Sequence, residues 1–199
     1  MKVEDRLKPK APTVEPGVYL GICIGVIDLG EQYSEKYKNY DNKVQLVFEL
    51  PYETIEVDGK QEPKQLSREF KITAKPGSKF RDFISAMNGK TYSDDDFKAL
   101  ELFDQIGKAC QLNVVLSESG EYANIETVMP LMKGMPVPET NTEPIKWDMD
   151  AWDDEVFQKL PEWVQEKIKK STQYQKLHAP DTVVEVKETA NTAEGSCPI

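Results

Sequence analysis

The sequence is poor in the residues that most catalytic and metal sites require. It contains one histidine, His178, and three widely spaced cysteines, Cys23, Cys110 and Cys197, with no CxxC spacing. A Ser-His-Asp or Cys-His site, or a multi-histidine metal site, would depend on that one histidine in a polar tail. We therefore expect no enzyme activity, no metal site and no cofactor, and we expect the cysteines to be reduced thiols.

Long apolar runs are also absent. No segment approaches the ~20 apolar residues of a membrane-spanning helix, and residues 1–5 lack the apolar core of a signal peptide. The sequence therefore predicts a cytoplasmic protein without a membrane partner. Its 25 Lys and Arg against 35 Asp and Glu give a net charge of −10. This excludes a large cationic surface that embraces DNA, but it leaves room for a local basic patch.

Alternating apolar residues predict three strands in the first half of the chain. We expect a long first strand with one apolar face and bend-permitting glycines on the other, its apolar even positions being Val18, Leu20, Ile22, Ile24 and Val26. The alternation repeats at 42–50 and at 65–73. Asp58-Gly59 supplies a turn between these two strands.

Helical spacing and two further strands complete the expected domain. Apolar spacing over 78–89 predicts an amphipathic helix that Ser78 caps and Gly89 ends, and Ser93 with three aspartates predicts a second helix start. Alternation then predicts strands at 109–116 and 122–129. This order matches a five-stranded Greek-key barrel of the oligonucleotide- and oligosaccharide-binding (OB) type better than a sandwich or parallel sheet. The expected fold class is mainly β with helices.

Composition predicts the domain organisation around this barrel. The expected segments are a flexible arm at 1–16, the OB-type barrel at 17–130, a Pro-rich acidic linker at 131–150, a helical appendage at 151–176 and a disordered acidic tail at 177–199. The appendage is predicted because its apolar residues are spaced by four.

The loop expected between the first two strands, residues 30–40, is the most informative stretch. Its three tyrosines, at 33, 37 and 40, alternate with Lys36 and Lys38. Such a pattern suits an unpaired nucleic acid strand, because aromatic rings stack on bases and ammonium groups meet phosphates. The alternative is that the tyrosines fold back and cover one end of the barrel.

A second basic group runs from the third expected strand into the next helix. Lys71 should share an outer face with Lys43, so this group could line one groove beside the tyrosine loop. The candidate nucleic-acid-binding residues are then Tyr19, Tyr33, Lys36, Tyr37, Lys38, Lys43, Arg68, Lys71, Lys75, Lys79 and Arg81. The alternative for each cation is a solvated surface position, with Arg68 neutralised by a carboxylate.

Two acidic clusters are weighed as metal sites. The aspartates at 94–96 are better explained by helix capping, and the acidic residues at 148–155 lack the glycine and terminal glutamate of a calcium loop. The second cluster lies beside Trp147 and Trp152. That mixture is typical of a docking peptide for a basic, apolar groove, and also of a segment that packs on its own barrel.

Six short blocks carry a family resemblance by their succession along the chain. They are GVIDLGEQ at 25–32, VFELP at 47–51, SKFR at 78–81, GKACQL at 107–112, YANI at 122–125 and LPEWVQEKI at 160–168. In these blocks the chain resembles a family of small phage early proteins, encoded among replication and recombination genes and described as single-stranded-DNA-binding-like. The resemblance implies a barrel that coats exposed single strands in the cytoplasm of the infected bacterium. Bacterial single-strand-coating proteins end in an acidic tip whose last residue is aromatic, and residues 195–199 depart from that pattern.

We therefore expect a module that binds single-stranded DNA with little sequence specificity during phage DNA replication or recombination. Residues 139–199 hold 7 Lys against 13 Asp and Glu, a net charge of −6. This acidic part is a candidate docking site for phage or host replication and recombination proteins, or an occupant of the empty groove. The alternative function is an acidic adaptor or inhibitor that binds a host replication or defence protein by imitating nucleic acid.

Overall fold

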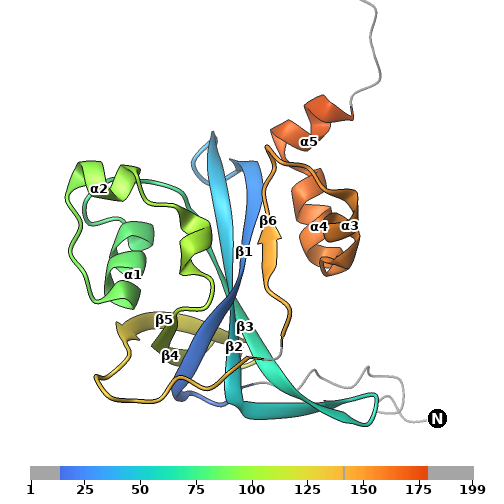
Figure 1. The fold of residues 1–199 in the computed structure, drawn as a ribbon. Coiled ribbons are helices and arrows are strands. Elements are labelled where there is room, and N and C mark those ends of the chain that lie inside the picture. The colour runs from blue at the N-terminus through green and yellow to red at the C-terminus, as the bar shows by residue number, and fades with distance from the viewer. Residues whose placement is uncertain (1–13, 141, 179–199) are drawn as a thin grey trace, which may run out of the picture.

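The computed structural model describes residues 14–140 and 142–178 (Figure 1). Its centre is a six-stranded, mainly antiparallel sheet in which five strands have the order β3-β2-β1-β4-β5. These are β1 (Gly17–Ser34), β2 (Asn39–Val57), β3 (Lys60–Lys71), β4 (Ala109–Leu116) and β5 (Ala123–Pro130). Strand β6 (Ile145–Trp147) pairs in parallel with β1. The predicted mainly β fold with helices is confirmed.

The two outer strands of this order, β3 and β5, are not joined by a backbone ladder within the described residues, so the sheet is not closed. They do approach each other at one point, where the guanidinium of Arg68 in β3 donates a hydrogen bond to the carbonyl oxygen of Glu126 in β5 (2.5 Å). The closed five-stranded barrel of the prediction is therefore not confirmed.

Three helices connect β3 to β4, and their ends follow the capping rules. Helix α1 (Lys79–Asn88) begins where the Ser78 hydroxyl accepts the Arg81 N–H, and it ends at Gly89, which adopts a left-handed conformation (φ 57°). Helix α2 (Asp94–Lys98) begins at Ser93 in the same way, and the 3-10 helix η2 (Leu102–Gln105) follows. The predicted caps at Ser78, Gly89 and Ser93 are confirmed.

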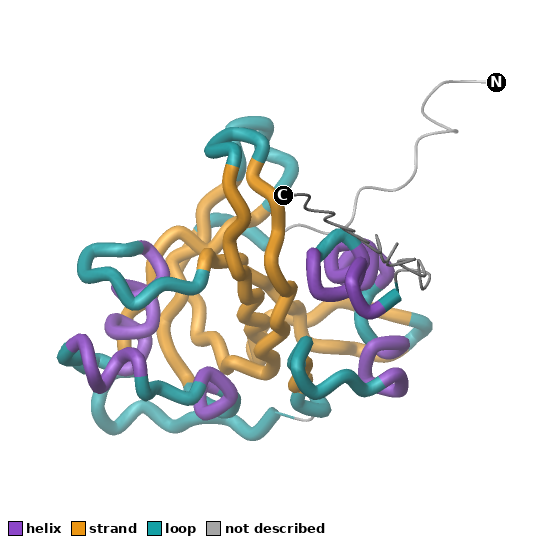
Figure 2. Tube along the Cα trace, turned by 90° about the horizontal axis from the view of Figure 1, so that it is seen from above, coloured by secondary structure: helices purple, strands orange, loops and turns teal. Residues whose placement is uncertain are grey.

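Both faces of the sheet carry apolar side chains, and a separate layer of helices covers each face (Figures 1 and 2). On the first face, α1 and α2 pack over a core that includes Phe48, Phe83 and Ile84. On the second face lie the helices α3 (Asp154–Lys159), α4 (Glu162–Lys169) and α5 (Thr172–Leu177), and β6, which is paired with β1 in the sheet, contributes Trp147 to the same core. This second core is formed by Ile22, Ile24, Ile27, Leu29, Val47, Trp147, Met149, Phe157, Leu160, Val164 and Ile168.

A β-bulge in β1 distributes its apolar residues between the two cores. The pairing with β2 passes from Cys23–Phe48 to Gly25–Val47, so Ile24 is the extra residue of the bulge. Ile22 belongs to the second core, whereas Val26 belongs to the first. The prediction of a single apolar face along the even positions of this strand is therefore wrong, because the bulge shifts the alternation by one residue.

The C-terminal segment is an integral layer of this fold. The segment expected as a linker, 131–150, includes β6 and the buried Trp147, and α3, α4 and α5 lie in and just beyond the segment expected as a helical appendage. Polar contacts fix it to the sheet: Gln32 donates to the carbonyl oxygen of Lys167 (2.9 Å), and the Glu31 N–H donates to Gln173 (2.8 Å).

Two of the sequence predictions concern residues that the structure leaves out. Most of the arm expected at 1–16 and nearly all of the tail expected at 177–199 lie outside the described residues. None of the described helices has the length and apolar character required to cross a membrane.

Candidate nucleic-acid interface

The turn between β1 and β2, together with the adjoining strand ends, carries a cluster of exposed tyrosines. We call this segment, residues 33–40, the hairpin tip. Tyr33 and Tyr40 face each other across the hairpin with ring centroids 5.0 Å apart, yet they remain 48% and 54% exposed. Tyr37, at the turn itself, is 68% exposed. These rings do not fold back to cover one end of the sheet, so each keeps exposed surface that a ligand can reach.

The lysines of the hairpin tip lie beside these rings. The ammonium group of Lys36 is 5.3 Å from the ring centroid of Tyr37, a cation–π distance. Lys38 occupies the left-handed region (φ 52°) that the tight turn requires. Neither lysine forms an ion pair with a carboxylate of the described chain, so both charges are available to phosphates.

Tyr19 lies apart from this cluster. It pairs with Leu112 of β4 near the start of β1, whereas Tyr33 lies near the end of the same 18-residue strand. Its hydroxyl donates to the carbonyl oxygen of Glu15 (2.8 Å), and its ring packs against the first core. The structure therefore does not bring Tyr19 together with Tyr33 and Tyr37.

Lys43 and Lys71 lie directly opposite each other on β2 and β3, which places them on one face of the sheet as the sequence predicts. Both are paired: Lys43 lies 2.8 Å from Glu69, and Lys71 lies 2.5 Å from Asp41. Glu69 also pairs with Lys167 of α4. Burial acts to raise the pKa of Glu69, but hydrogen bonds and charges from Lys167 and Lys43 outweigh it and lower that pKa. Glu69 therefore stays ionised and offsets part of this positive charge.

Arg68 belongs to the opposite face of the sheet. Its guanidinium lies 5.0 Å from the Phe70 ring centroid and 5.2 Å from that of Phe83, both members of the first core. Its hydrogen bond partner is the backbone carbonyl of Glu126 rather than a carboxylate. Arg68 therefore does not share one groove with Lys43 and Lys71.

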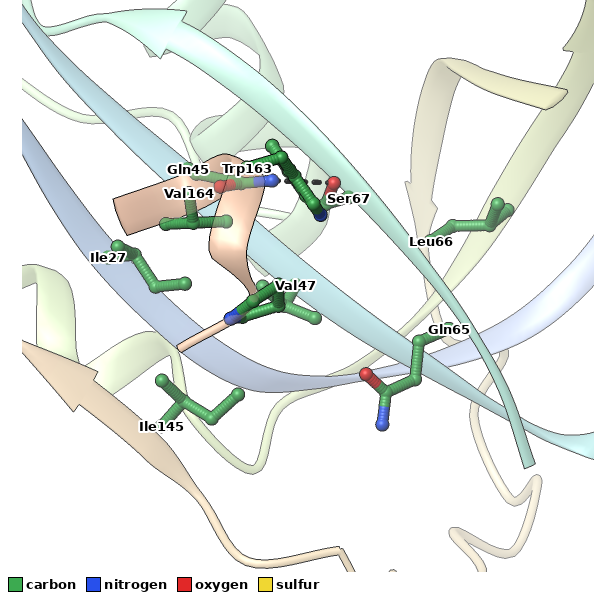
Figure 3. A pocket seen from close by; sticks show the side chains of 10 residues that line it. Ile27, Gln45, Val47, Gln65, Leu66, Ser67, Ile145, Trp163 and Val164 are labelled. Carbon is green, nitrogen blue, oxygen red and sulfur yellow. Dashed lines mark hydrogen bonds between the residues drawn. The ribbon is translucent and has the colours of Figure 1, made fainter. Parts of the chain in front are cut away.

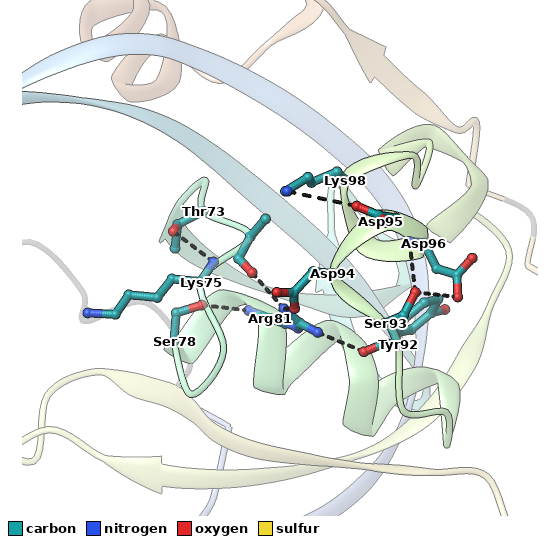
Figure 4. A network of polar contacts seen from close by, with 11 residues as sticks. Thr73, Lys75, Ser78, Arg81, Tyr92, Ser93, Asp94, Asp95, Asp96 and Lys98 are labelled. Atoms are coloured by element: carbon teal, nitrogen blue, oxygen red, sulfur yellow. Dashed lines mark hydrogen bonds and ion pairs between the residues drawn. The ribbon is translucent and has the colours of Figure 1, made fainter.

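Arg81 is buried and holds the loop that connects α1 to α2 (Figure 4). It donates to the carbonyl oxygens of Ala74 and Tyr92 (both 2.7 Å), and it pairs with Asp94 at 2.5 Å. These contacts occupy the guanidinium, so Arg81 has a structural role here. Lys75 and Lys79 are exposed and form no ion pair within the described residues, and Figure 4 shows Lys75 pointing away from the network.

The structure thus gathers Tyr33, Lys36, Tyr37 and Lys38 and adds a residue that the candidate set leaves out. Tyr40 is the cross-strand neighbour of Tyr33, a relation set by the hairpin register rather than by spacing in the sequence. The other cations of the set lie elsewhere: Lys43 and Lys71 on one face of the sheet, Arg68 on the other, and Lys75, Lys79 and Arg81 in the loop after β3 and in α1.

Helix α5 adds a second feature that the sequence analysis misses. Gln173 accepts from the Glu31 N–H and lies 3.4 Å from Asn42, so α5 runs beside the stem of the hairpin. The exposed Lys170 and Lys176 flank this contact in the chain. The sequence feature that could have indicated this second feature is the lysine-rich stretch 167–176, which lies within a segment of net negative charge.

Comparisons with known proteins leave this interface to be judged on its geometry. No protein-family model matches the chain, and no curated protein or solved structure is significantly similar to it. No group of three or more His, Cys, Asp or Glu side chains in residues 14–140 and 142–178 is placed to hold a metal ion.

Proposed function

We propose that the protein binds single-stranded DNA with little base preference through the hairpin tip. The observation that carries this proposal is that the hairpin tip holds three exposed tyrosine rings and two lysines that form no ion pair within residues 14–140 and 142–178. Stacking of a base on an aromatic ring contributes about 1–3 kcal/mol and tolerates any base, because every base has a π face. The lysines supply phosphate contacts.

The strand order supports the OB-type barrel that we propose for this fold, open between β3 and β5. Barrels of this type are partly open, and they bind oligonucleotides with the face of strands two and three and with the loop between strands one and two. The hairpin tip is the equivalent loop here. In the same proposal, the protein acts on strands exposed during phage DNA replication or recombination in the bacterial cytoplasm.

The net charge of −10 opposes this function at long range but not at the tip itself. Charges farther away than ~8 Å are largely screened at physiological salt. Within residues 33–40, Lys36 and Lys38 face only one acidic residue, Glu35. The local balance therefore favours a phosphate chain.

The same net charge favours a second candidate function. A protein of charge −10 could bind a basic surface of a host replication or defence protein by imitating nucleic acid. In that case the acidic C-terminal part would form the contact, and single strands would not bind at the hairpin tip.

A salt titration distinguishes the two candidates. We expect the full-length protein to bind a fluorescent oligothymidine, with a logarithm of affinity that falls linearly with the logarithm of salt concentration, and to bind a duplex of equal length more weakly. Lys36→Gln combined with Lys38→Gln should lower that slope by about 1.4, because each phosphate contact on a single strand contributes about 0.7. Absence of oligothymidine binding at low salt would instead support the acidic adaptor.

A further inference from the structure

A cavity of about 200 Å³ lies on the second face of the sheet, between β2, β3, β6 and the start of α4 (Figure 3). Its apolar walls are contributed by Ile27, Val47, Leu66, Ile145, Pro161 and Val164. The remaining lining residues are Gln45, Gln65, Ser67 and Trp163. Apolar walls with a few polar groups are typical of sites for small flat ligands.

Gln45 lines this cavity with an amide that is only half satisfied. The residue is 3% exposed, its Nε2 donates to the Ser67 hydroxyl at 2.7 Å, and its Oε1 is buried without a partner in the described chain. Reversing the amide would pair the oxygen with Ser67 but leave the nitrogen unpaired instead. A buried polar atom without a partner lowers stability, which a leucine of similar size would avoid.

Trp163 flanks the same cavity and is not a member of the second core. The buried residues of α4 are Val164 and Ile168, whereas Trp163 is 53% exposed. An indole ring that stays half in solvent beside an apolar cavity offers a stacking surface.

Cations lie beside the cavity on the side of the hairpin tip. Gln45 pairs across the sheet with Glu69, to which both Lys43 and Lys167 are bound, and Lys71 lies opposite Lys43. A strand that leaves the tip along β2 and β3 would meet these lysines before it reaches the cavity. These three lysines outnumber their carboxylate partners, Glu69 and Asp41, by one. The remaining positive charge next to a small apolar site favours a flat ligand that carries phosphate.

We propose that this cavity receives one unpaired base of the bound single strand, with Trp163 as its stacking partner and an N–H of the base donating to Gln45. The inference rests on the proposed function and adds a second contact point to it. The walls at Ile27, Val47 and Ile145 would exclude water from the inserted base. Each of the four DNA bases carries an N–H on its pairing edge, so this site would not impose a strong sequence preference.

Photo-crosslinking of the full-length protein to an oligothymidine that contains bromodeoxyuridine tests the proposal. We expect crosslinks at Trp163 in addition to the tyrosines of the hairpin tip. Trp163→Ala should remove the crosslinks at position 163 and weaken binding of the oligothymidine about fivefold or more. Trp163→Phe keeps an aromatic ring, so its affinity should stay within about twofold of the wild-type affinity.

The outcomes separate this inference from the proposed function. Crosslinks confined to the hairpin tip, with unchanged affinity of Trp163→Ala, would overturn the cavity site and leave strand binding at the tip intact. Crosslinks confined to Trp163 would support the cavity site and contradict the tip. A wild-type protein that binds no strand at all would overturn both.

Gln45→Leu gives a second and independent readout. Because it removes a buried unpaired atom, we expect an unchanged or higher melting temperature together with about fivefold weaker strand binding. Unchanged affinity in this variant would mean that Gln45 does not contact the base and would overturn its role. If Gln45→Leu is destabilised, the Trp163 variants decide the matter.

Discussion

Replacing Tyr33 and Tyr37 together with alanine is expected to weaken binding of a single-stranded oligothymidine by about 2 kcal/mol or more, roughly 30-fold. Both rings are exposed, at 48% and 68%, so their loss removes stacking surface rather than core packing. The measurement is an anisotropy titration of the full-length variant and wild type at the same salt concentration. Thermal melting should show a change of less than about 1 kcal/mol, attributable to the lost pair of Tyr33 and Tyr40.

Tyr52→Ala provides the matched control. Tyr52 is 70% exposed in β2, far along the strand from the hairpin tip, and the substitution removes the same chemical group. We expect its affinity for the oligothymidine to equal that of the wild type. If the Tyr33 and Tyr37 double variant also binds normally, the strand does not stack at the hairpin tip.

Trp147→Ala is expected to lower the free energy of unfolding by about 3–5 kcal/mol. Trp147 is 1% exposed, and its ring centroid lies 4.8 Å from that of Trp152 and 5.3 Å from that of Phe157. Truncation would leave a large cavity in the second core, between β1 and the C-terminal helices. Chemical denaturation followed by circular dichroism measures the loss without relying on tryptophan fluorescence.

Trp163→Ala is the control for this measurement, since it makes the same change in the same C-terminal segment at a half-exposed position. We expect it to alter stability by no more than about 0.5 kcal/mol. A loss below ~1 kcal/mol for Trp147→Ala would show that the C-terminal segment is a detachable appendage instead of the second layer of the fold.

Local sequence signals account for much of the fold. The strands at 109–116 and 122–129 agree with β4 and β5 to within a residue, and Asp58-Gly59 separates β2 from β3 as expected. Alternation and capping residues act through neighbours in the chain, which is why they can be recognised without a structure.

The missed features depend on contacts between distant segments. The bulge at Ile24 leaves no mark on the alternation of Val18 to Val26, because both faces of β1 are apolar. Strand β6 is only three residues long and exists through its pairing with β1. The proline-rich composition of 131–150 predicts a linker, and Trp147 alone is not enough to predict a strand there.

For the candidate site, too, the sequence predicts the local cluster of residues but not the placement of the more distant cations. Exposed tyrosines and lysines in one turn form a local pattern, and the structure keeps Tyr33, Lys36, Tyr37 and Lys38 together. The roles of the candidate cations from Lys43 onward instead depend on which face of the sheet each occupies and on partners such as Glu69, Asp41 and Asp94. Those partners are remote in sequence, so periodicity could not identify them.

The most direct test of strand binding at the hairpin tip is backbone amide chemical-shift mapping of the isotope-labelled full-length protein during titration with oligothymidine. The account predicts that residues 33–40 show the largest changes and that these changes decrease as salt concentration rises. Unchanged amides at 33–40 under saturating oligothymidine, with shifts confined to other segments or absent altogether, would contradict it.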